Sequence, residues 1–124
     1  MMVHIDTSAL IDALTGPRRS LPLLIDIVSE GHRLAISSIV LYEWLRGPRT
    51  ADELRAQEEL LPSDASIPFD AAEVRRAVRL YKGVKRPRGR EIDLTIAACA
   101  VEHGAALWTL NPADFKDIPD LQTI

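Results

Sequence analysis

The sequence is poor in cysteine and has no long apolar run. It contains one cysteine, Cys99, which excludes an intrachain disulfide and a cysteine-based zinc cluster. No apolar run approaches the roughly 18 residues that a membrane helix needs. The N-terminus also lacks the basic and apolar segments of a signal peptide. We therefore expect a cytoplasmic protein that makes no contact with a membrane.

The remaining composition is that of an ordinary globular chain. Apolar residues make up 47% of the 124 residues and charged residues 27%, with 6 Gly and 8 Pro. These values exclude a disordered or collagen-like chain. The length is that of one domain, over residues 1–124, that can bury a core without cross-links.

The charges are unevenly distributed. The formal net charge is −3, yet eight of the fifteen Lys and Arg residues fall between Arg75 and Arg90, and no acid interrupts that stretch. A basic segment on an acidic body is a plausible contact for a polyanion. The alternative is a solvated helix face followed by a charged loop, and composition alone does not decide between the two.

Turn and capping signals divide the chain into short strands that alternate with helices. We predict strands over residues 3–5, 33–36, 66–69, 105–109 and, more weakly, 121–124. Counted with their capping residues, helices are predicted over 6–14, 20–31, 37–46, 50–61, 70–83 and 90–103. This alternation predicts an α/β fold, a three-layer α/β/α sandwich around a short, mainly parallel sheet. Ligands of such sheets bind beyond the carboxyl ends of the strands.

Two acids follow predicted strands directly and so belong at that edge. Asp6 comes after the first strand, and Asp114 comes after strand 105–109 in an Asn-Pro-Ala-Asp turn. Helix capping would explain Asp6, but Thr7 and Ser8 could cap equally well. Ordinary turn chemistry would explain Asp114.

Two further acids interrupt apolar helices. Glu43 is the one charged residue between Ile39 and Trp44, and Asp93 lies in a helix that is apolar almost all round. A carboxylate on a buried helix is costly unless it is paired or binds a metal. The structural alternatives to metal binding are ion pairs within a helix, of Glu43 with Arg46 and of Asp93 with Arg90.

Four acids at one sheet edge favour a divalent cation. Carboxylates that share a pocket repel one another, and a bound cation removes that repulsion. Oxygen ligands without cysteine, and with the three histidines scattered, suit Mg²⁺ or Mn²⁺. Beside a basic segment, such a site points to hydrolysis of phosphodiester bonds.

The order and spacing of four segments resemble the PIN-domain ribonucleases, and within them the VapC-like toxins of toxin–antitoxin pairs. The segments are residues 5–11, 38–47, 91–98 and 107–115. The resemblance implies a PIN-like fold and a catalytic, metal-binding quartet of Asp6, Glu43, Asp93 and Asp114. It also implies supporting hydrogen bonds from Ser8, Thr109 and Asn111.

The same resemblance implies an activity and partners. Its members are metal-dependent endoribonucleases that cut structured RNA such as tRNA or rRNA. They form homodimers and are silenced by an antitoxin whose tail lies across the active-site groove.

The loop before the third acid carries four closely spaced bases. We expect Lys85, Arg86, Arg88 and Arg90 to act as a clamp for RNA phosphates.

Two rival functions remain open. One is a catalytically silent PIN-like module that binds RNA or protein, which the presence of all four acids disfavours. The other is a phosphotransfer domain, which needs a second acid beside Asp6 and a lysine after a late strand. Neither stands in the required setting, because Lys116 lies between Phe115 and Asp117. Incubation with acetyl phosphate and with RNA would separate these activities.

Overall fold

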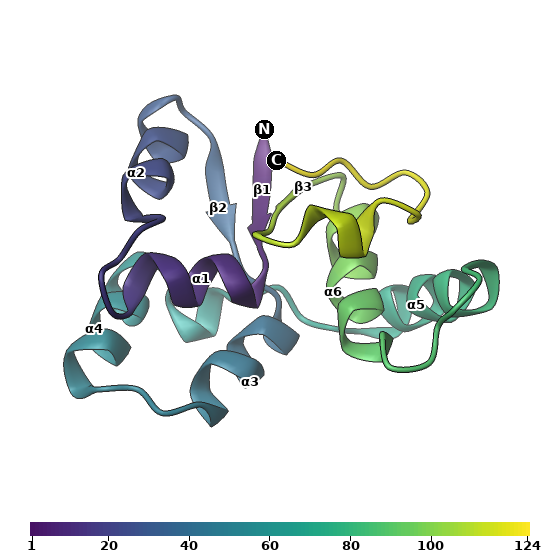
Figure 1. Cartoon of the computed structure of the whole chain (residues 1–124), viewed down its shortest axis with the longest axis horizontal. Coiled ribbons are helices and arrows are strands. Elements are labelled where there is room, and N and C mark those ends of the chain that lie inside the picture. The colour runs from purple at the N-terminus through teal and green to yellow at the C-terminus, as the bar shows by residue number, and fades with distance from the viewer.

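Three short parallel strands form the sheet at the centre of the molecule. The computed structural model describes all 124 residues. The strands are β1 (Met2–Ile5), β2 (Arg33–Ala35) and β3 (Ala106–Trp108), in the order β2-β1-β3 (Figure 1). The central strand is almost fully buried, as its apolar sequence and two parallel neighbours require.

Six α-helices and two short 3₁₀ turns surround this sheet. The helices are α1 (Thr7–Leu14), α2 (Leu21–Ser29), α3 (Ser38–Arg46), α4 (Ala51–Leu60), α5 (Ala71–Gly83) and α6 (Glu91–Glu102). The 3₁₀ turns are η1 (Ser63–Ala65) and η2 (Pro112–Phe115). In Figure 1, α1 to α4 lie on the side of β2, and α5, α6 and η2 lie on the side of β3. The predicted α/β sandwich is thereby confirmed.

Side-chain caps explain where most helices begin. Asp6 accepts the backbone N–H of Thr7 at 2.9 Å, and Ser37 Oγ accepts that of Val40 at 3.2 Å. Thr50 and Glu53 satisfy each other's backbone N–H groups in a capping box. Ser20 stands at the predicted start of α2 but makes no capping bond, because its hydroxyl donates instead to Asp12.

Two of the predicted strands are absent. Residues 66–69 form only one bridge, between Ile67 and Ser37, and residues 121–124 form only one, between Thr123 and Leu107. Both predictions were wrong because each segment pairs at a single point. Pro68 has no N–H to continue the first ladder, and the second segment meets β3 only at Leu107.

The register of the sheet positions the carboxyl edge. Ile5 pairs with Trp108, and the N–H of Asp6 donates to the carbonyl of Trp108 at 2.8 Å. The residues that follow these two strands, Asp6 and Thr109, therefore meet although they are 103 positions apart in the chain.

The core fills the space between the sheet and the helices. Its largest fully buried side chains include Trp44, Trp108, Leu10 and Leu94. Helix α6 buries the run Ile96–Ala100, as its apolar sequence predicts. None of the helices has the length and apolar character needed to cross a membrane.

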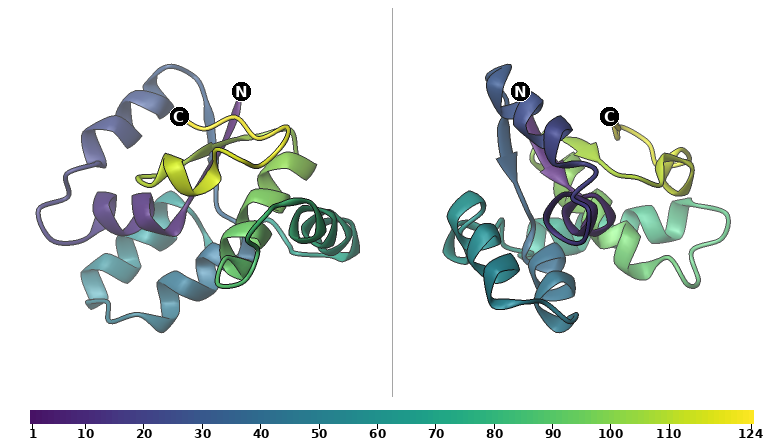
Figure 2. Two further views of the ribbon diagram at one scale, coloured as in Figure 1. Left: turned by 45° about the vertical axis from the view of Figure 1, so that its right-hand side comes forward. Right: turned by 60° about the vertical axis from the view of Figure 1, so that its left-hand side comes forward.

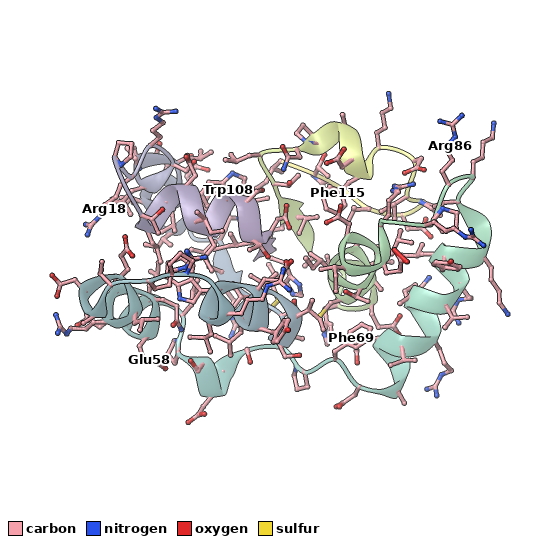
Figure 3. The ribbon with its side chains drawn as sticks, turned by 60° about the horizontal axis from the view of Figure 1, so that its bottom comes forward. Arg18, Glu58, Phe69, Arg86, Trp108 and Phe115 are labelled. Carbon is pink, nitrogen blue, oxygen red and sulfur yellow. The ribbon has the colours of Figure 1, made fainter.

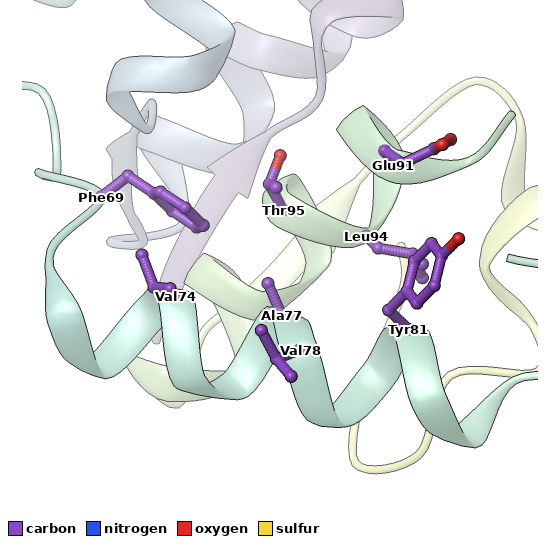
Figure 4. Close-up of a pocket in the computed structure, with 8 residues that line it drawn as sticks. All are labelled: Phe69, Val74, Ala77, Val78, Tyr81, Glu91, Leu94 and Thr95. Atoms are coloured by element: carbon purple, nitrogen blue, oxygen red, sulfur yellow. The ribbon is translucent and has the colours of Figure 1, made fainter. Parts of the chain in front are cut away.

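Helix α5 stands at the edge of the molecule and packs mainly on α6 (Figure 2). Between the two helices runs an apolar groove of about 260 Å³, lined by Phe69, Val74, Val78, Tyr81 and Leu94 among others (Figure 4). Apolar side chains are also exposed on α2 and α3, where Leu23, Tyr42 and Leu45 reach solvent.

A buried histidine lies on β1 opposite the core side chains. His4 is 2% exposed, and neither of its ring nitrogens has a hydrogen-bond partner. Its ring centroid is 6.0 Å from that of His103, which contacts Glu73 at 3.1 Å. Burial, and to a lesser extent the charge of His103, lowers the pKa of His4 from its ordinary 6.5 to about 4.

This histidine makes the stability of the fold depend on pH. Well above pH 6.5 the ring is neutral in the folded and in the unfolded chain, so the contribution of His4 to the free energy of unfolding does not change with pH. Between pH 6.5 and about 4 the unfolded chain binds a proton that the folded chain rejects. We expect the free energy of unfolding to fall by about 3 kcal/mol over this range from His4 alone. Urea titrations at several pH values measure it.

The non-titrating variant His4→Phe should show a shallower loss of stability toward low pH than the wild type. His32→Asn is the matched control, because it removes a histidine from a partly exposed turn outside the core. Equal slopes for the wild type and His4→Phe would contradict the prediction.

Candidate functional site

Asp6 is the most firmly held acid at the carboxyl edge of the sheet. It is 5% exposed, and its Oδ2 accepts hydrogen bonds from Thr109 Oγ1 at 2.7 Å and Ser8 Oγ at 3.0 Å. Its Oδ1 accepts the N–H of Thr7 at 2.9 Å. One carboxylate therefore receives three donors from two chain segments. Capping is part of its role, but capping alone would not require burial or the two hydroxyl donors.

The predicted supporting residues take their places around Asp6. The hydroxyls of Ser8 and Thr109 bind it directly, and each accepts a backbone N–H, that of Leu110 at 3.2 Å and that of Asn111 at 3.0 Å. Asn111 thus contributes its backbone, while its exposed side chain makes no hydrogen bond. These bonds fix the orientation of both hydroxyls.

Glu43 reaches the same edge from helix α3. Its Oε1 accepts the hydroxyl of Thr7 at 2.6 Å, and its Oε2 lies 3.4 Å from Arg46. The side chain is only 17% exposed, so the ion pair with Arg46 exists but does not place Glu43 on a solvated face. Thr7 thereby joins the second acid to the first.

Thr7 is a site residue that the sequence analysis did not single out. It was considered only as a possible cap, because Asp-Thr-Ser is a common helix start. Its contact with Glu43 spans 36 positions in the chain. The only sequence signal is its position, one residue after an acid at the end of a strand.

Asp93 and Asp114 are the less constrained pair. Asp93 is half-buried in the first turn of α6, Asp114 is exposed in η2, and neither carboxylate makes a hydrogen bond or ion pair. Burial raises the pKa of Asp93 above its ordinary value, and the nearby negative charges of Asp6, Asp114 and Glu43 raise it further. The four predicted acids therefore share one region of negative potential.

Arg90 compensates part of this charge but does not pair with Asp93. Its guanidinium donates two parallel hydrogen bonds to Asp117, at 2.7 and 2.9 Å, and a third to the backbone carbonyl of Asp114 at 3.0 Å. The proposed partnership of Arg90 with Asp93 is therefore wrong, because Asp117 offers the planar fork that a guanidinium prefers. Its positive charge still opposes the rise in the pKa of Asp93.

The basic segment divides into paired and unpaired residues. Arg76 is bound to Glu102 at 3.0 Å, and Arg90 to Asp117. The other six bases are exposed and make no ion pair; they are Arg75, Arg79, Lys82, Lys85, Arg86 and Arg88. The loop carrying three of them leads straight into α6 and its Asp93.

The donor chemistry of the region suits a hard divalent cation, although its side chains are not arranged as a finished metal site. No three histidine, cysteine, aspartate or glutamate side chains could hold a metal ion together as they stand. Four carboxylates without a thiol or imidazole are nonetheless the oxygen donors that Mg²⁺ and Mn²⁺ take. Asp93 and Asp114 have no hydrogen bonds to lose if they turn toward an ion.

Comparison with known proteins places the chain in a family. The family model of the PIN domain matches residues 3–121. Ribonuclease VapC19 of Mycobacterium tuberculosis is 33% identical over 124 residues, which cover 98% of both chains.

Solved structures agree in fold. A VapBC2 complex from Rickettsia felis bound to a DNA fragment from its promoter matches with a TM-score of 0.77 and 25% identity, over 100% of this chain and 98% of that one. A toxin–antitoxin complex from Klebsiella pneumoniae matches with a TM-score of 0.73 and 27% identity, over 98% and 95% of the two chains. From its sequence and its fold, this chain belongs to the PIN-domain family.

Proposed function

We propose that this protein is an endoribonuclease of the VapC type, the toxin of a toxin–antitoxin pair, and that it depends on Mg²⁺ or Mn²⁺. The observation that carries the proposal is that Thr7 links Asp6 and Glu43 at the carboxyl edge of the sheet, with Asp93 and Asp114 near enough for the charges to raise the pKa of Asp93. The match along 98% of a protein named as a ribonuclease supports the reaction class. Structured RNA such as tRNA or rRNA is the proposed substrate.

Two of the four acids have carboxylates held by hydrogen bonds, and the other two have carboxylates without hydrogen bonds. Asp6 and Glu43 are oriented by hydroxyl donors and would hold the cation, and Asp93 and Asp114 would turn to complete its shell. The bound metal would supply an activated water and would neutralise charge on the phosphodiester. The hydroxyls of Ser8 and Thr109 hold Asp6 in one orientation, as supporting hydrogen bonds do in metal sites generally.

Protons and cations compete for Asp93. Because its pKa is raised by burial and by the neighbouring acids, it binds a proton more readily than an isolated aspartate does. Metal binding to this carboxylate would therefore weaken as the pH falls, because a proton and a cation compete for the same oxygens.

The partners follow from the same proposal. An antitoxin protein, a second copy of the chain and RNA are the three expected partners. Complexes of the VapBC type are among the similar structures, which supports the antitoxin. Exposed apolar side chains on α2, α3 and α5 are the kind of surface that protein partners cover.

The first test replaces an acid without changing its shape. Asp6→Asn should lower RNA cleavage by more than about 100-fold, beyond the 10- to 100-fold typical of supporting residues. It should also relieve growth arrest when the chain is expressed in bacteria. EDTA should abolish cleavage by the wild type, and added Mg²⁺ or Mn²⁺ should restore it. Mapping RNA ends after brief expression identifies the substrate.

The control for this test is Asp64→Asn, which removes the same charge from the exposed turn η1. It should leave cleavage unchanged. Full activity of Asp6→Asn, or of the wild type in excess EDTA, would contradict the proposal. A wild type that binds RNA but never cuts it would favour the silent binding module.

The second test addresses Thr7 as a positioning residue. Thr7→Val removes the hydroxyl that holds Glu43 and keeps the shape of the side chain. A hydrogen bond to a charged group contributes about 1.5–3 kcal/mol. We therefore expect cleavage to fall by about 10- to 100-fold, and the metal concentration for half-maximal cleavage to rise.

Thr7→Ser keeps the hydroxyl and should recover most of the activity and of the metal response. A purely structural role would instead lower the melting temperature of Thr7→Val and leave the metal response unchanged. Equal metal responses for the valine and serine variants would reject the positioning role.

A further inference from the structure

A hollow of about 490 Å³ opens beside the acids, on the side of η2. It is lined by Arg86, Arg90, Ala113, Asp114, Lys116 and Asp117. Its size lies within the range of about 300–1,000 Å³ found for small-molecule pockets. Asp114 belongs to both the acidic edge and this hollow, so the two spaces adjoin each other.

The charges of the hollow are not equivalent. Arg90 is neutralised by its two bonds to Asp117, which also raise the pKa of the guanidinium and lower that of the carboxyl. Arg86 and Lys116 are exposed and make no ion pair. The hollow therefore offers two positively charged side chains without an ion-pair partner. They lie on chain segments 30 positions apart.

Arg90 gives the hollow its shape. By binding Asp117 and the carbonyl of Asp114, it ties the start of α6 to η2 and to the turn after it. Figure 3 shows Arg86 projecting outward from the loop after α5, on the same side of the molecule as the turn that carries Phe115. Arg86 and Lys116 thus lie on two chain segments that the hydrogen bonds of Arg90 hold together.

An RNA strand that enters the acidic site has a specific electrostatic need. A bound cation would offset the charge of the acids at the cleaved phosphate, whereas the next phosphate would face the negative field of the same carboxylates. The free positive charges that share a hollow with Asp114 are those of Arg86 and Lys116.

Resting on the proposed ribonuclease function, we propose that Arg86 and Lys116 form a subsite for the RNA phosphate adjacent to the one that is cleaved. Arg90 supports this subsite through its hydrogen bonds to Asp117 and Asp114 and does not itself bind the phosphate. Of the four bases expected to clamp RNA, Arg86 and Arg90 line the hollow, and Lys116 joins them from the segment after η2.

The test measures RNA binding apart from cleavage. A short fluorescent single-stranded RNA is titrated into Asp6→Asn protein and its Arg86→Gln, Lys116→Gln and double variants, at a low, fixed Mg²⁺ concentration. Each lost phosphate contact should weaken binding and reduce the slope of log affinity against log salt by about 0.7, or about 1.4 for the double variant. With otherwise wild-type acids, Lys116→Gln should raise KM more than it lowers kcat.

Arg79→Gln and Lys82→Gln are the matched controls, because both residues are exposed on α5 and neither lines the hollow. They should change the salt slope less than the subsite variants do. Equal slopes for all four single variants would overturn the subsite and indicate only general attraction. Unchanged RNA binding by Lys116→Gln together with weaker binding of poly-glutamate would assign the hollow to an acidic protein segment and would also overturn it.

The subsite and the proposed function fail in different ways. A wild type that cuts no RNA with either metal contradicts the function. A wild type that cuts RNA, with a Lys116→Gln variant of unchanged KM and salt slope, contradicts only the subsite.

Discussion

The hydrogen bonds that converge on Asp6 connect the fold to the site. Because β1 and β3 are parallel and in register, the residue after each strand emerges at the same edge, and Thr109 donates to Asp6 there. The same carboxylate starts helix α1 by accepting the N–H of Thr7, whose hydroxyl then positions Glu43 from α3. A single buried carboxylate therefore aligns a strand end, a helix start and a second acid. The stability of the sheet edge and the geometry of the site have one origin.

The four acids show how a fold can accommodate like charges near one another. The two that are most buried receive hydroxyl and N–H donors, which spread their charge over fixed dipoles. The other two remain without donors: Asp93 responds with a raised pKa, and Asp114 stays in solvent. Arg90 supplies positive charge nearby while bonded elsewhere. Hydrogen bonds thus fix the carboxylates of Asp6 and Glu43, whereas those of Asp93 and Asp114 have no such bonds.

Local patterns in the sequence predicted much of this structure. The helix boundaries followed from caps such as Ser37 and Thr50, and the parallel sheet followed from short apolar strands between helices. The four acids were predicted from their places after strands or within apolar helices, and the resemblance to PIN-domain ribonucleases joined them into a quartet, since turn chemistry alone would explain Asp114. What could not be predicted depends on distant pairs. Asp117 competes for Arg90 across 27 positions, Thr7 reaches Glu43 across 36, and Ile67 pairs with Ser37 at only one point. Spacing along the chain carries no signal for such partners.

The attachment of α5 has a mechanical consequence. This helix rests mainly on α6 and makes few contacts with the rest of the molecule. Because it rests on one neighbour at the edge of the molecule, displacing it would disturb less of the core than displacing β1 or α6 would. The loop that follows α5 ends at Arg90, and the ion pair of Arg90 with Asp117 fixes that end of the loop. The unpaired bases of the segment are therefore concentrated on one peripheral helix and its loop, and a single ion pair fixes the end of that loop beside the acids.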